Sequence, residues 1–445
     1  MSAENKMADQ PIIKLIVTMS LPPITSMFMQ YSYNFVDSAF VAQLGEKALT
    51  AVSLSFPITA LMCAASIGLG VGVNVLIARY LGRREQDNAD TASTLGILLA
   101  FVCGLVLNIA AMFVIKPYFK AFTKDSEIYA LCLDYMSICV FMQIPNMVHI
   151  AIQKIIQATG NMIAPMCFQI AGVIFNLIFD PVLIFGIGIF PKMGIKGAAV
   201  STVLGYTFSM VLAFYVLLCR KQKVKVKIRG FRLQWDMIRS VFTLGLPSFI
   251  MNALNSFMVT FANMFLVGYS MMSVAFFGAY YKAQHMIVMT VNGLIQGCLP
   301  IMSFNYGARQ YDRLNSTYFY GTAIAAVMMT LGGLLLFACP RGILGLFKAS
   351  EEMIALGTKA MKIMALGYAF NGISTMTATY MQAVGRVRIS MTINLMRQLI
   401  VLLPMMYILS SFKGLDGIWL AFPVTETITL IFALVMLKKV YKKVE

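Results

Sequence analysis

Long apolar stretches, separated by short polar and charged segments, run through almost the whole chain. A helix needs about 20 apolar residues to cross the hydrocarbon core of a bilayer, and twelve stretches are long enough to do so. Hydrophobic residues make up 59% of the 445 residues and charged residues 12%. A soluble chain could not bury that much apolar surface, so we predict an all-α polytopic membrane protein. The predicted spans are 13–43, 49–79, 91–116, 128–156, 162–190, 195–219, 237–268, 272–304, 315–340, 353–384, 388–411 and 416–437.

The two halves of the chain repeat at one constant spacing, the spacing between Leu21 and Leu246, which we call the repeat offset. Each half has an even number of spans, so both halves enter the membrane from the same side and should be related by a pseudo-twofold axis along the membrane normal. Duplicated halves are typical of transporters, whose substrate site lies near the bilayer midplane. We therefore predict an N-terminal lobe over 1–219, a basic cytoplasmic linker over 220–236 and a C-terminal lobe over 237–445. The matching positions are Leu21-Pro22 with Leu246-Pro247, Gly68 with Gly293, Gly72 with Gly297, Gly82 with Gly307, Asp87 with Asp312, and 157–160 with 382–385.

The net charge of +17 follows a topological pattern. Basic residues are in excess in the even-numbered connections, and the densest run, RKQKVKVKIRGFR, covers 220–232. Cytoplasmic loops of membrane proteins are enriched in Lys and Arg, so we predict that both termini are cytoplasmic and that the protein lies in the inner or plasma membrane. We interpret the basic run as a connector that touches anionic lipid headgroups, and we expect no nucleic-acid partner.

The sequence offers little for enzymatic or cofactor chemistry. The chain has two histidines and eight scattered cysteines without a C-x-x-C pair, so we expect no metal cofactor. Gly68-x-Gly70-x-Gly72 lies inside a predicted span and lacks the Lys-Ser/Thr of a phosphate-binding loop. A membrane enzyme would need a catalytic dyad at the membrane surface, and a channel would not need duplicated halves. We therefore predict a transporter that draws on an ion gradient.

Acids inside the predicted spans include Asp37, Asp180 and Glu426. A charged residue in hydrocarbon costs about 2.5–3.5 kcal/mol on insertion scales, so these acids should face the protein interior. Tyr33 and Asn176 each stand four residues before an acid, on the same helical face. Such a group could bind a proton or a sodium ion. Alternatively, the acids could be structural, hydrogen-bonded residues that pin a kinked helix.

The second half of the chain serves as an internal control for these acids. At the repeat offset, Ala262 and Met405 occupy the positions of Asp37 and Asp180. If helix packing required the acids, both halves should carry them. The asymmetry therefore favours an ion site in the N-terminal half.

Other polar side chains could line a cavity. Asn146, His149 and Gln153 share one face of the fourth predicted span, where they could line the cavity or bond to neighbouring helices. Lys282 and Glu426 could form an ion pair or face a cavity of the C-terminal half. The chain has 35 Met and 32 Phe residues, which suit an adaptable surface for bulky lipophilic cations.

An ordered set of motifs makes the chain resemble the multidrug and toxic compound extrusion (MATE) transporters from about residue 12 to 438. The details look most like the bacterial MepA-like branch of that family. The motifs are Leu21-Pro22, the segment from Asp37 to Gly45, Arg79-Tyr80-Leu81-Gly82, Gln157-x-x-Gly160, Asn176-x-x-x-Asp180-Pro181, Gly194-Ile195-Lys196-Gly197-Ala198-Ala199 followed by Ser201-Thr202, and Asn305-Tyr306-Gly307-Ala308-Arg309.

The resemblance implies a V-shaped pair of six-helix lobes that export cationic drugs by alternating access, in antiport with protons or sodium. It also implies a coupling site made of Asp37, Asn176, Asp180 and Thr202, with Tyr33 beside Asp37. A sodium ion would take the first four residues as ligands. We expect a monomer whose partners are small lipophilic cations and membrane lipid.

The chain differs from some members of this family, and one rival function has to be considered. Some relatives use acids of spans 7 and 10 as a cation site in the C-terminal lobe, but this chain has Asn252, Asn255 and Asn371 there. A cation site in that lobe is therefore not expected. The nearest rival is a lipid-linked precursor flippase, which tends to have more spans and a cationic central cavity. Lys282 is the main deep cation here, which favours cationic cargo.

Overall fold

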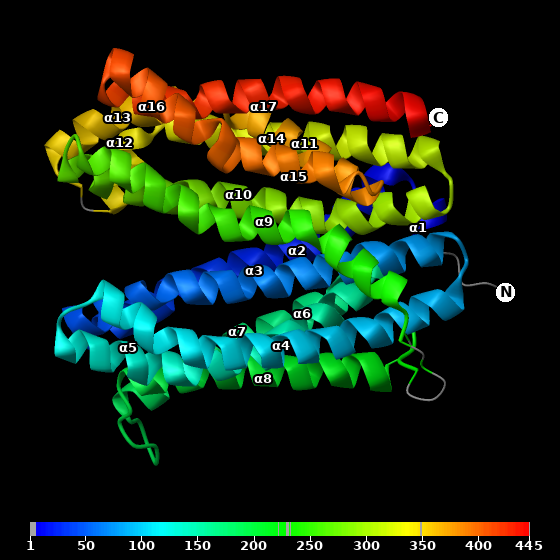
Figure 1. The fold of residues 1–445 in the computed structure, drawn as a ribbon, viewed down its shortest axis with the longest axis horizontal. Helices are drawn as coiled ribbons and strands as arrows, with labels where there is room; N and C mark the ends of the chain where they lie inside the picture. The colour runs from blue at the N-terminus through cyan, green and yellow to red at the C-terminus, as the bar shows by residue number, and fades with distance from the viewer. Residues whose placement is uncertain (1–5, 221, 228–230, 232, 348, 445) are drawn as a thin grey trace. The chain divides into compact units, whose positions relative to one another are not determined.

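A computed structural model describes residues 6–220, 222–227, 231, 233–347 and 349–444. All regular secondary structure in these ranges is helical. Five positions of the predicted basic run (221, 228–230 and 232) lie outside the described residues. The predicted all-α class is confirmed (Figure 1).

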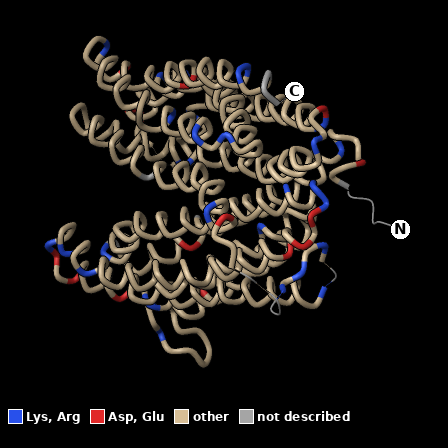
Figure 2. The backbone as a smooth tube through the Cα atoms, turned by 45° about the vertical axis from the view of Figure 1, so that its right-hand side comes forward, with Lys and Arg blue, Asp and Glu red and all other residues tan. Residues whose placement is uncertain are grey.

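The number of spans also agrees with the sequence prediction. Within the described ranges, eleven helical segments are long and apolar enough to cross a membrane. Glu351–Ala365 and Tyr368–Ala383 pass the same test together, with a bend of 46° between them, and counting this pair as one span gives twelve. In Figure 2 long uncharged stretches follow the helices, and most charged residues lie toward the helix ends. This is the distribution that an apolar membrane interior requires.

Packing divides the chain into two compact units, one formed by Thr25–Phe249 and the other by Met1–Ile24 with Ile250–Glu445. The division falls inside two helices, α2 (Ile12–Ala42) and α9 (Trp235–Val267). The two division points, after Ile24 and after Phe249, are themselves separated by the repeat offset. We call Thr25–Phe249 unit A and the remainder unit B.

The remaining helices follow in chain order. Unit A contains α3 (Glu46–Gly82), α4 (Gln86–Phe122), α5 (Ser126–Cys139), the 3₁₀ turn η1 (Val140–Met142), α6 (Gln143–Ala158), α7 (Ile163–Phe185) and α8 (Ile195–Cys219). Unit B contains α1 (Lys6–Asp9), α10 (Met271–Gly307), α11 (Tyr311–Ala338), α12 (Pro340–Leu346), α13 (Glu351–Ala365), α14 (Tyr368–Ala383), α15 (Val387–Leu395), the π-turn η2 (Met396–Ile400), α16 (Leu402–Lys413) and α17 (Leu415–Val444).

The backbone carries the internal repeat that the sequence predicts. Arg84 and Arg309, which the repeat offset pairs, are the two described non-glycine residues with positive φ, at 62° and 58°. Positive φ is uncommon for residues with a side chain, so its recurrence at equivalent positions is a specific match. Gly160 and Gly385 are paired in the same way and have φ of 88° and 81°.

In unit A, glycines let α3 cross the first part of α9 at close range. A Cβ atom on Gly72 would lie 2.0 Å from the Val241 carbonyl oxygen, and one on Gly68 would lie 2.7 Å from the Phe249 Cβ. Small residues at such crossings let helix backbones approach closely, which gives membrane helices their packing contacts.

Unit B repeats this crossing between α10 and the first part of α2. A Cβ atom on Gly293 would lie 2.5 Å from the Ile24 side chain, and one on Gly297 would lie 2.3 Å from the Ser20 hydroxyl. The Ser20 hydroxyl donates to the Leu294 carbonyl at 3.4 Å. The predicted glycine repeat is therefore a repeat of helix crossings.

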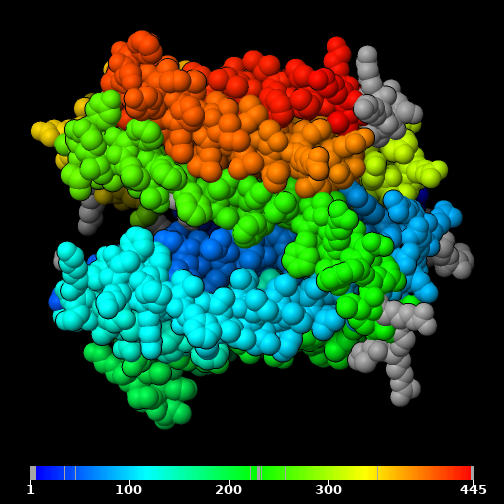
Figure 3. Space-filling view, viewed as in Figure 1, coloured from blue at the N-terminus to red at the C-terminus, as the bar shows by residue number. Residues whose placement is uncertain are grey.

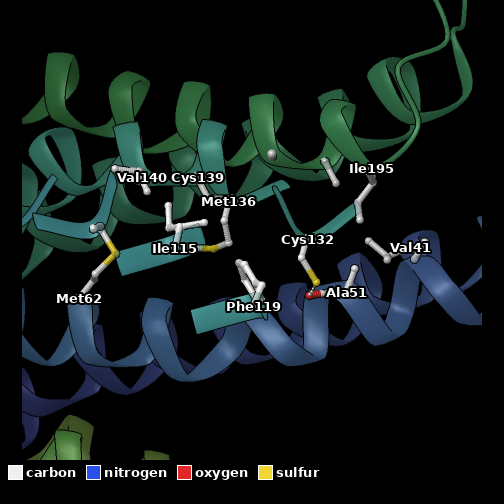
Figure 4. Close-up of a cluster of buried hydrophobic side chains, with 14 of the residues drawn as sticks. Val41, Ala51, Met62, Ile115, Phe119, Cys132, Met136, Cys139, Val140 and Ile195 are labelled. Carbon is white, nitrogen blue, oxygen red and sulfur yellow. Dashed lines mark hydrogen bonds between the residues drawn. The ribbon is translucent and has the colours of Figure 1, made fainter. Parts of the chain in front are cut away.

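A hydrophobic cluster holds α5 against its neighbours in unit A. Phe119, Cys132 and Met136 are fully buried there. Figure 4 shows the Cys132 side chain pointing toward Ala51 and the Met136 side chain beside Ile115. The Cys132 thiol lies 3.8 Å from the Ala51 carbonyl oxygen. This cysteine is thus a small buried apolar side chain, as the scattered cysteines suggested.

The described part of the basic linker lies against α4. The Lys225 amide donates to the Asp90 carboxylate at 2.9 Å, and the Lys227 ammonium bonds Asp87 at 2.7 Å. This hydrogen bond raises the pKa of Lys227 above its ordinary value. The loop between α7 and α8, by contrast, projects from unit A (Figures 1 and 3), and its Ile189 is 94% exposed.

Candidate functional site

The two acids of the N-terminal half meet inside unit A. Asp37 on α2 is half-buried and Asp180 on α7 is fully buried. Their carboxyl groups lie side by side, and the hydroxyls of Tyr33 and Ser201 lie beside Asp180. We call Tyr33, Asp37, Asp180 and Ser201 the carboxyl cluster. Three of its four members were predicted from the sequence.

The oxygen atoms around this cluster lack hydrogen-bond partners. Asp37 Oδ1, both Asp180 carboxylate oxygens, Asn176 Oδ1 and Ser201 Oγ are buried, and among the described residues none makes a contact with hydrogen-bond geometry. Buried polar atoms are normally paired, and two adjacent carboxylates repel each other when both are ionised. A bound proton or cation would supply what these oxygens lack.

Close packing of α7 on α8 places Asp180 and Asn176. A Cβ atom on Gly172 would lie 1.8 Å from Ser209 Oγ, and one on Gly205 would lie 1.9 Å from Asn176 Oδ1. The Ser209 hydroxyl donates to the Phe168 carbonyl at 3.2 Å. These small residues bring the two helices together, so that Asn176 rests on the surface of Gly205, one turn before Asp180.

Pro181 loosens the helix directly after Asp180. It has no N–H, so the hydrogen bond that residue 181 would give to the Leu177 carbonyl is missing. The helix nevertheless continues to Phe185 and ends at Gly186, in the left-handed conformation with φ 75° and ψ 57°. The proline therefore frees a carbonyl near the acid without ending the helix.

The structure places Ser201 in the cluster where the resemblance implied Thr202. The Thr202 hydroxyl donates to the Ala198 carbonyl of its own helix at 2.9 Å, whereas Ser201 is fully buried beside Asp180. The sequence does carry a signal for this, because Ser201, Gly205 and Ser209 form a small-residue stripe with a spacing of four. Tyr135 of α5 interacts electrostatically with both acids, and no local pattern pointed to it.

The predicted polar face of α6 contacts neighbouring helices. Asn146 lies 3.4 Å from the Ser66 hydroxyl. Gln153 donates to Gln169 at 2.9 Å, and Gln169 donates to Gln30 of α2 at 3.0 Å. This glutamine ladder fixes α2 to α7 about two turns before Asp37.

His149 lies on the same face of α6 and is 4% exposed. Its ring packs edge-on against Phe168, with 5.4 Å between centroids. Neither ring nitrogen has a hydrogen-bond partner among the described residues. His149 is therefore a buried aromatic neighbour of the α7 surface that also carries Asn176.

In unit B, Glu426 has other partners than the sequence suggested. Arg397 Nε lies 3.3 Å from Glu426 Oε1, and Asn371 Nδ2 donates to the same oxygen at 2.8 Å. Lys282, the partner that we expected, is exposed on α10. Sequence reasoning missed Arg397, although it lies inside the predicted span 388–411. Its pairing with Glu426 depends on the π-turn η2, where the helical register shifts.

The ligand chemistry of the carboxyl cluster suits a hard monovalent cation or a proton. In the described chain, no group of three or more His, Cys, Asp or Glu residues is arranged to hold a metal ion. The cluster offers carboxylate, amide and hydroxyl oxygens, which are ligands of hard cations, and it offers no imidazole or thiolate set for a transition metal.

Comparison with known protein families gives one matching model, MatE, over residues 22–182 and again over residues 247–408. The starting positions of the two matches, 22 and 247, are separated by the repeat offset. The family model thus recognises each half of the chain separately.

Curated relatives match over almost their whole length. The FAD transporter of Shewanella oneidensis is 27% identical over 420 residues, which is 94% of this chain and 92% of the relative. The multidrug export protein MepA of Staphylococcus aureus is 23% identical over 434 residues, 96% of this chain and 93% of the relative.

Solved structures with the same fold include an outward-facing multidrug resistance MATE transporter of the MOP superfamily, with a TM-score of 0.94 and 21% identity. A MOP superfamily transporter from Pyrococcus furiosus gives 0.93 and 22%. Both matches cover 100% of this chain and 99% of the other. The fold and the doubled family match lead to one conclusion: the chain belongs to the MatE family of multidrug and toxic compound extrusion transporters, and it is not an enzyme.

Proposed function

We propose that the protein is a secondary antiporter that exports small lipophilic cations in exchange for H⁺ or Na⁺ by alternating access. The observation that carries the proposal is the pair of adjacent acids, Asp37 and Asp180, whose buried oxygens lack partners. An acid pair inside a membrane span is costly unless it binds something. No resident cofactor is needed, because the coupling ion supplies the driving force.

The coupling step follows from charge. With the site empty, the two carboxylates repel, and a proton or a sodium ion removes the repulsion. Asp37 stands on α2, so loading changes the interaction of α2 with α7. The consecutive prolines Pro22 and Pro23 lie inside α2 and weaken its backbone hydrogen bonds, so the helix has a place to bend. We propose that this movement lowers the affinity for cargo.

Flux of ethidium, a fluorescent lipophilic cation, in proteoliposomes tests this function. A pH gradient and a Na⁺ gradient are imposed separately on the wild-type protein, and protein-free liposomes serve as the control. Flux driven by either gradient supports antiport and identifies the ion. Absence of flux under both gradients contradicts the proposal and directs attention to the lipid-linked precursor flippase.

Ser201 and Thr202 provide a matched test of the site. In Ser201→Ala, we expect the Na⁺ concentration for half-maximal flux to rise about tenfold, because the bound ion loses one oxygen partner and such a charged interaction contributes about 1.5–3 kcal/mol. In Thr202→Ala the change should stay below about twofold. The Thr202 hydroxyl donates to a carbonyl of its own helix and so is not a ligand of the ion. A larger effect at Thr202 than at Ser201 would mean that the ligand set implied by the family resemblance is correct.

Both termini are proposed to be cytoplasmic, with the basic linker on the same side. Lys225 lies in the described part of the linker. A cysteine introduced there should react with a membrane-impermeant maleimide in inside-out vesicles but not in intact cells, once the exposed native cysteines have been replaced. Labelling of intact cells would contradict this orientation.

A flavin dinucleotide is a second candidate cargo. The relative from Shewanella oneidensis is named as an FAD transporter and matches 94% of this chain. Such a cargo carries phosphates, which need a cationic partner, and unit B contains Arg397 inside a span. Adding FAD as a competitor to the ethidium flux assay distinguishes the two: inhibition supports a shared route, and no inhibition favours the cationic cargo.

A further inference from the structure

A second charged site lies within unit B. Arg397 of η2 and Glu426 of α17 form an ion pair at 3.3 Å, and each side chain is 15% exposed. Asn371 of α14 donates to the same Glu426 oxygen at 2.8 Å, and Arg397 Nη1 donates to the Thr375 hydroxyl. The pair is therefore neither fully enclosed nor at an exposed helix end.

Backbone irregularities surround this pair. Pro404 follows the π-turn η2. In a regular α-helix its ring would clash with the Ile400 carbonyl, and this clash accounts for the widened turn. α14 begins after the 46° bend that separates it from α13. At that bend, a Cβ atom on Gly367 would lie 3.0 Å from Pro423 Cα and 3.4 Å from Glu426 Cγ. Such π-turns and breaks in membrane helices often mark functional sites.

Some polar atoms of Arg397 and Glu426 make no hydrogen bond. A guanidinium group has five donors, and among the described residues its one hydrogen bond goes from Nη1 to Thr375. Glu426 Oε2 is buried without a hydrogen-bond partner, and Arg397 Nε faces Glu426 Oε1 in the ion pair without hydrogen-bond geometry. A buried ion pair with unused groups contributes little to stability, whereas ionisable residues inside a span commonly serve a transport function. The unused donors point to a ligand.

The geometry selects the chemistry of that ligand. The planar fork of an arginine fits two oxygens of a carboxylate or phosphate, and the residue stays charged at every physiological pH. Glu426 neutralises Arg397 when no ligand is present and competes with a bound anion, which keeps release possible. Tyr280 and Tyr368, whose hydroxyls lie 3.1 Å apart, are buried next to Glu426.

We infer that Arg397 anchors the carboxylate or phosphate group of amphiphilic cargo in unit B. The inference deepens the proposed transport function and rests on it for its physiological meaning. It adds a substrate class, compounds with an acidic group on an aromatic or apolar body, to the lipophilic cations. It also assigns the two units different tasks, because the carboxyl cluster lies in unit A.

Equilibrium binding to the full-length protein in nanodiscs, without any ion gradient, tests the inference. Two matched probe pairs are used: FMN against riboflavin, which differ by a phosphate, and a rhodamine with a free carboxylate against its ethyl ester. The variant is Arg397→Gln. The control is Arg388→Gln, which removes the same charge from an exposed position on α15. Arg397→Lys keeps the positive charge but lacks the planar guanidinium that can bind two oxygens. It replaces Arg397→Gln as the test variant if the latter does not fold.

We expect wild type to bind FMN or the free-acid rhodamine at least about tenfold more tightly than its neutral or esterified partner. Arg397→Gln should remove this preference, Arg397→Lys should reduce it, and Arg388→Gln should leave it unchanged. The probe pair that shows the preference identifies phosphate or carboxylate as the recognised group. No preference in wild type, or an equal loss in both glutamine variants, overturns the inference. Because this binding assay uses no ion gradient, its outcome is independent of the outcome of the gradient-driven flux assay.

Discussion

Replacing Asp37 or Asp180 by asparagine is expected to lower gradient-driven export by about a hundredfold, the upper range of coupling free energies between two sites. Asparagine keeps the shape of the side chain but cannot bind a proton or balance a cation. Downhill movement of cargo should persist, because the change affects the coupling ion and leaves the cargo contacts in place. Export against a gradient and exchange at equilibrium, measured in the same proteoliposomes, separate the two effects.

Asp134→Asn is the control for this prediction. Asp134 forms an exposed ion pair with Lys196 at 3.2 Å in the same unit, and exposed pairs contribute little. Its variant should export at close to the wild-type rate. If all three asparagine variants behave alike, the carboxyl cluster is not the coupling site.

Gly72→Ala is expected to destabilise the protein by about 1–3 kcal/mol, the usual cost of overpacking. The new Cβ would lie 2.0 Å from the Val241 carbonyl oxygen and 3.1 Å from the Gly245 nitrogen. These are backbone atoms, so α3 and α9 would have to separate. The melting temperature in detergent should fall by about 1–3 °C.

Gly278→Ala is the matched control within a helix. A Cβ atom there would meet no atom within 4 Å, so alanine should leave the melting temperature unchanged or raise it slightly through its better helix propensity. Equal melting temperatures for Gly72→Ala and wild type would show that the crossing of α3 and α9 is looser than the close backbone contact implies.

The elements of this fold are predictable from sequence because hydropathy and the glycine repeat are local signals. The twelve spans follow from the length of the apolar stretches, and the constant repeat offset predicts equivalent backbone features such as the positive φ of Arg84 and Arg309. The convergence of Asp37 with Asp180 could also be expected, since isolated acids in spans need polar surroundings.

The sequence did not predict which of two neighbouring residues faces the carboxyl cluster. Ser201 and Thr202 are adjacent, so their side chains point about 100° apart around the helix, and only the packing of α7 on α8 decides which one faces Asp180. The pairing of Arg397 with Glu426 could not be predicted for a related reason. The π-turn shifts the register of its helix, so the face that meets Glu426 differs from the face that an ideal helix would present.

In the proposed mechanism, cargo and coupling ion compete through Asp37 and Asp180. The most direct test is the dissociation constant of ethidium for the purified protein, measured as a function of pH and of Na⁺ concentration, in wild type and in Asp180→Asn. Lower pH or added Na⁺ should weaken binding to wild type and leave binding to Asp180→Asn unchanged. Wild-type affinity that is independent of both ions, or an equal dependence in the variant, would contradict it.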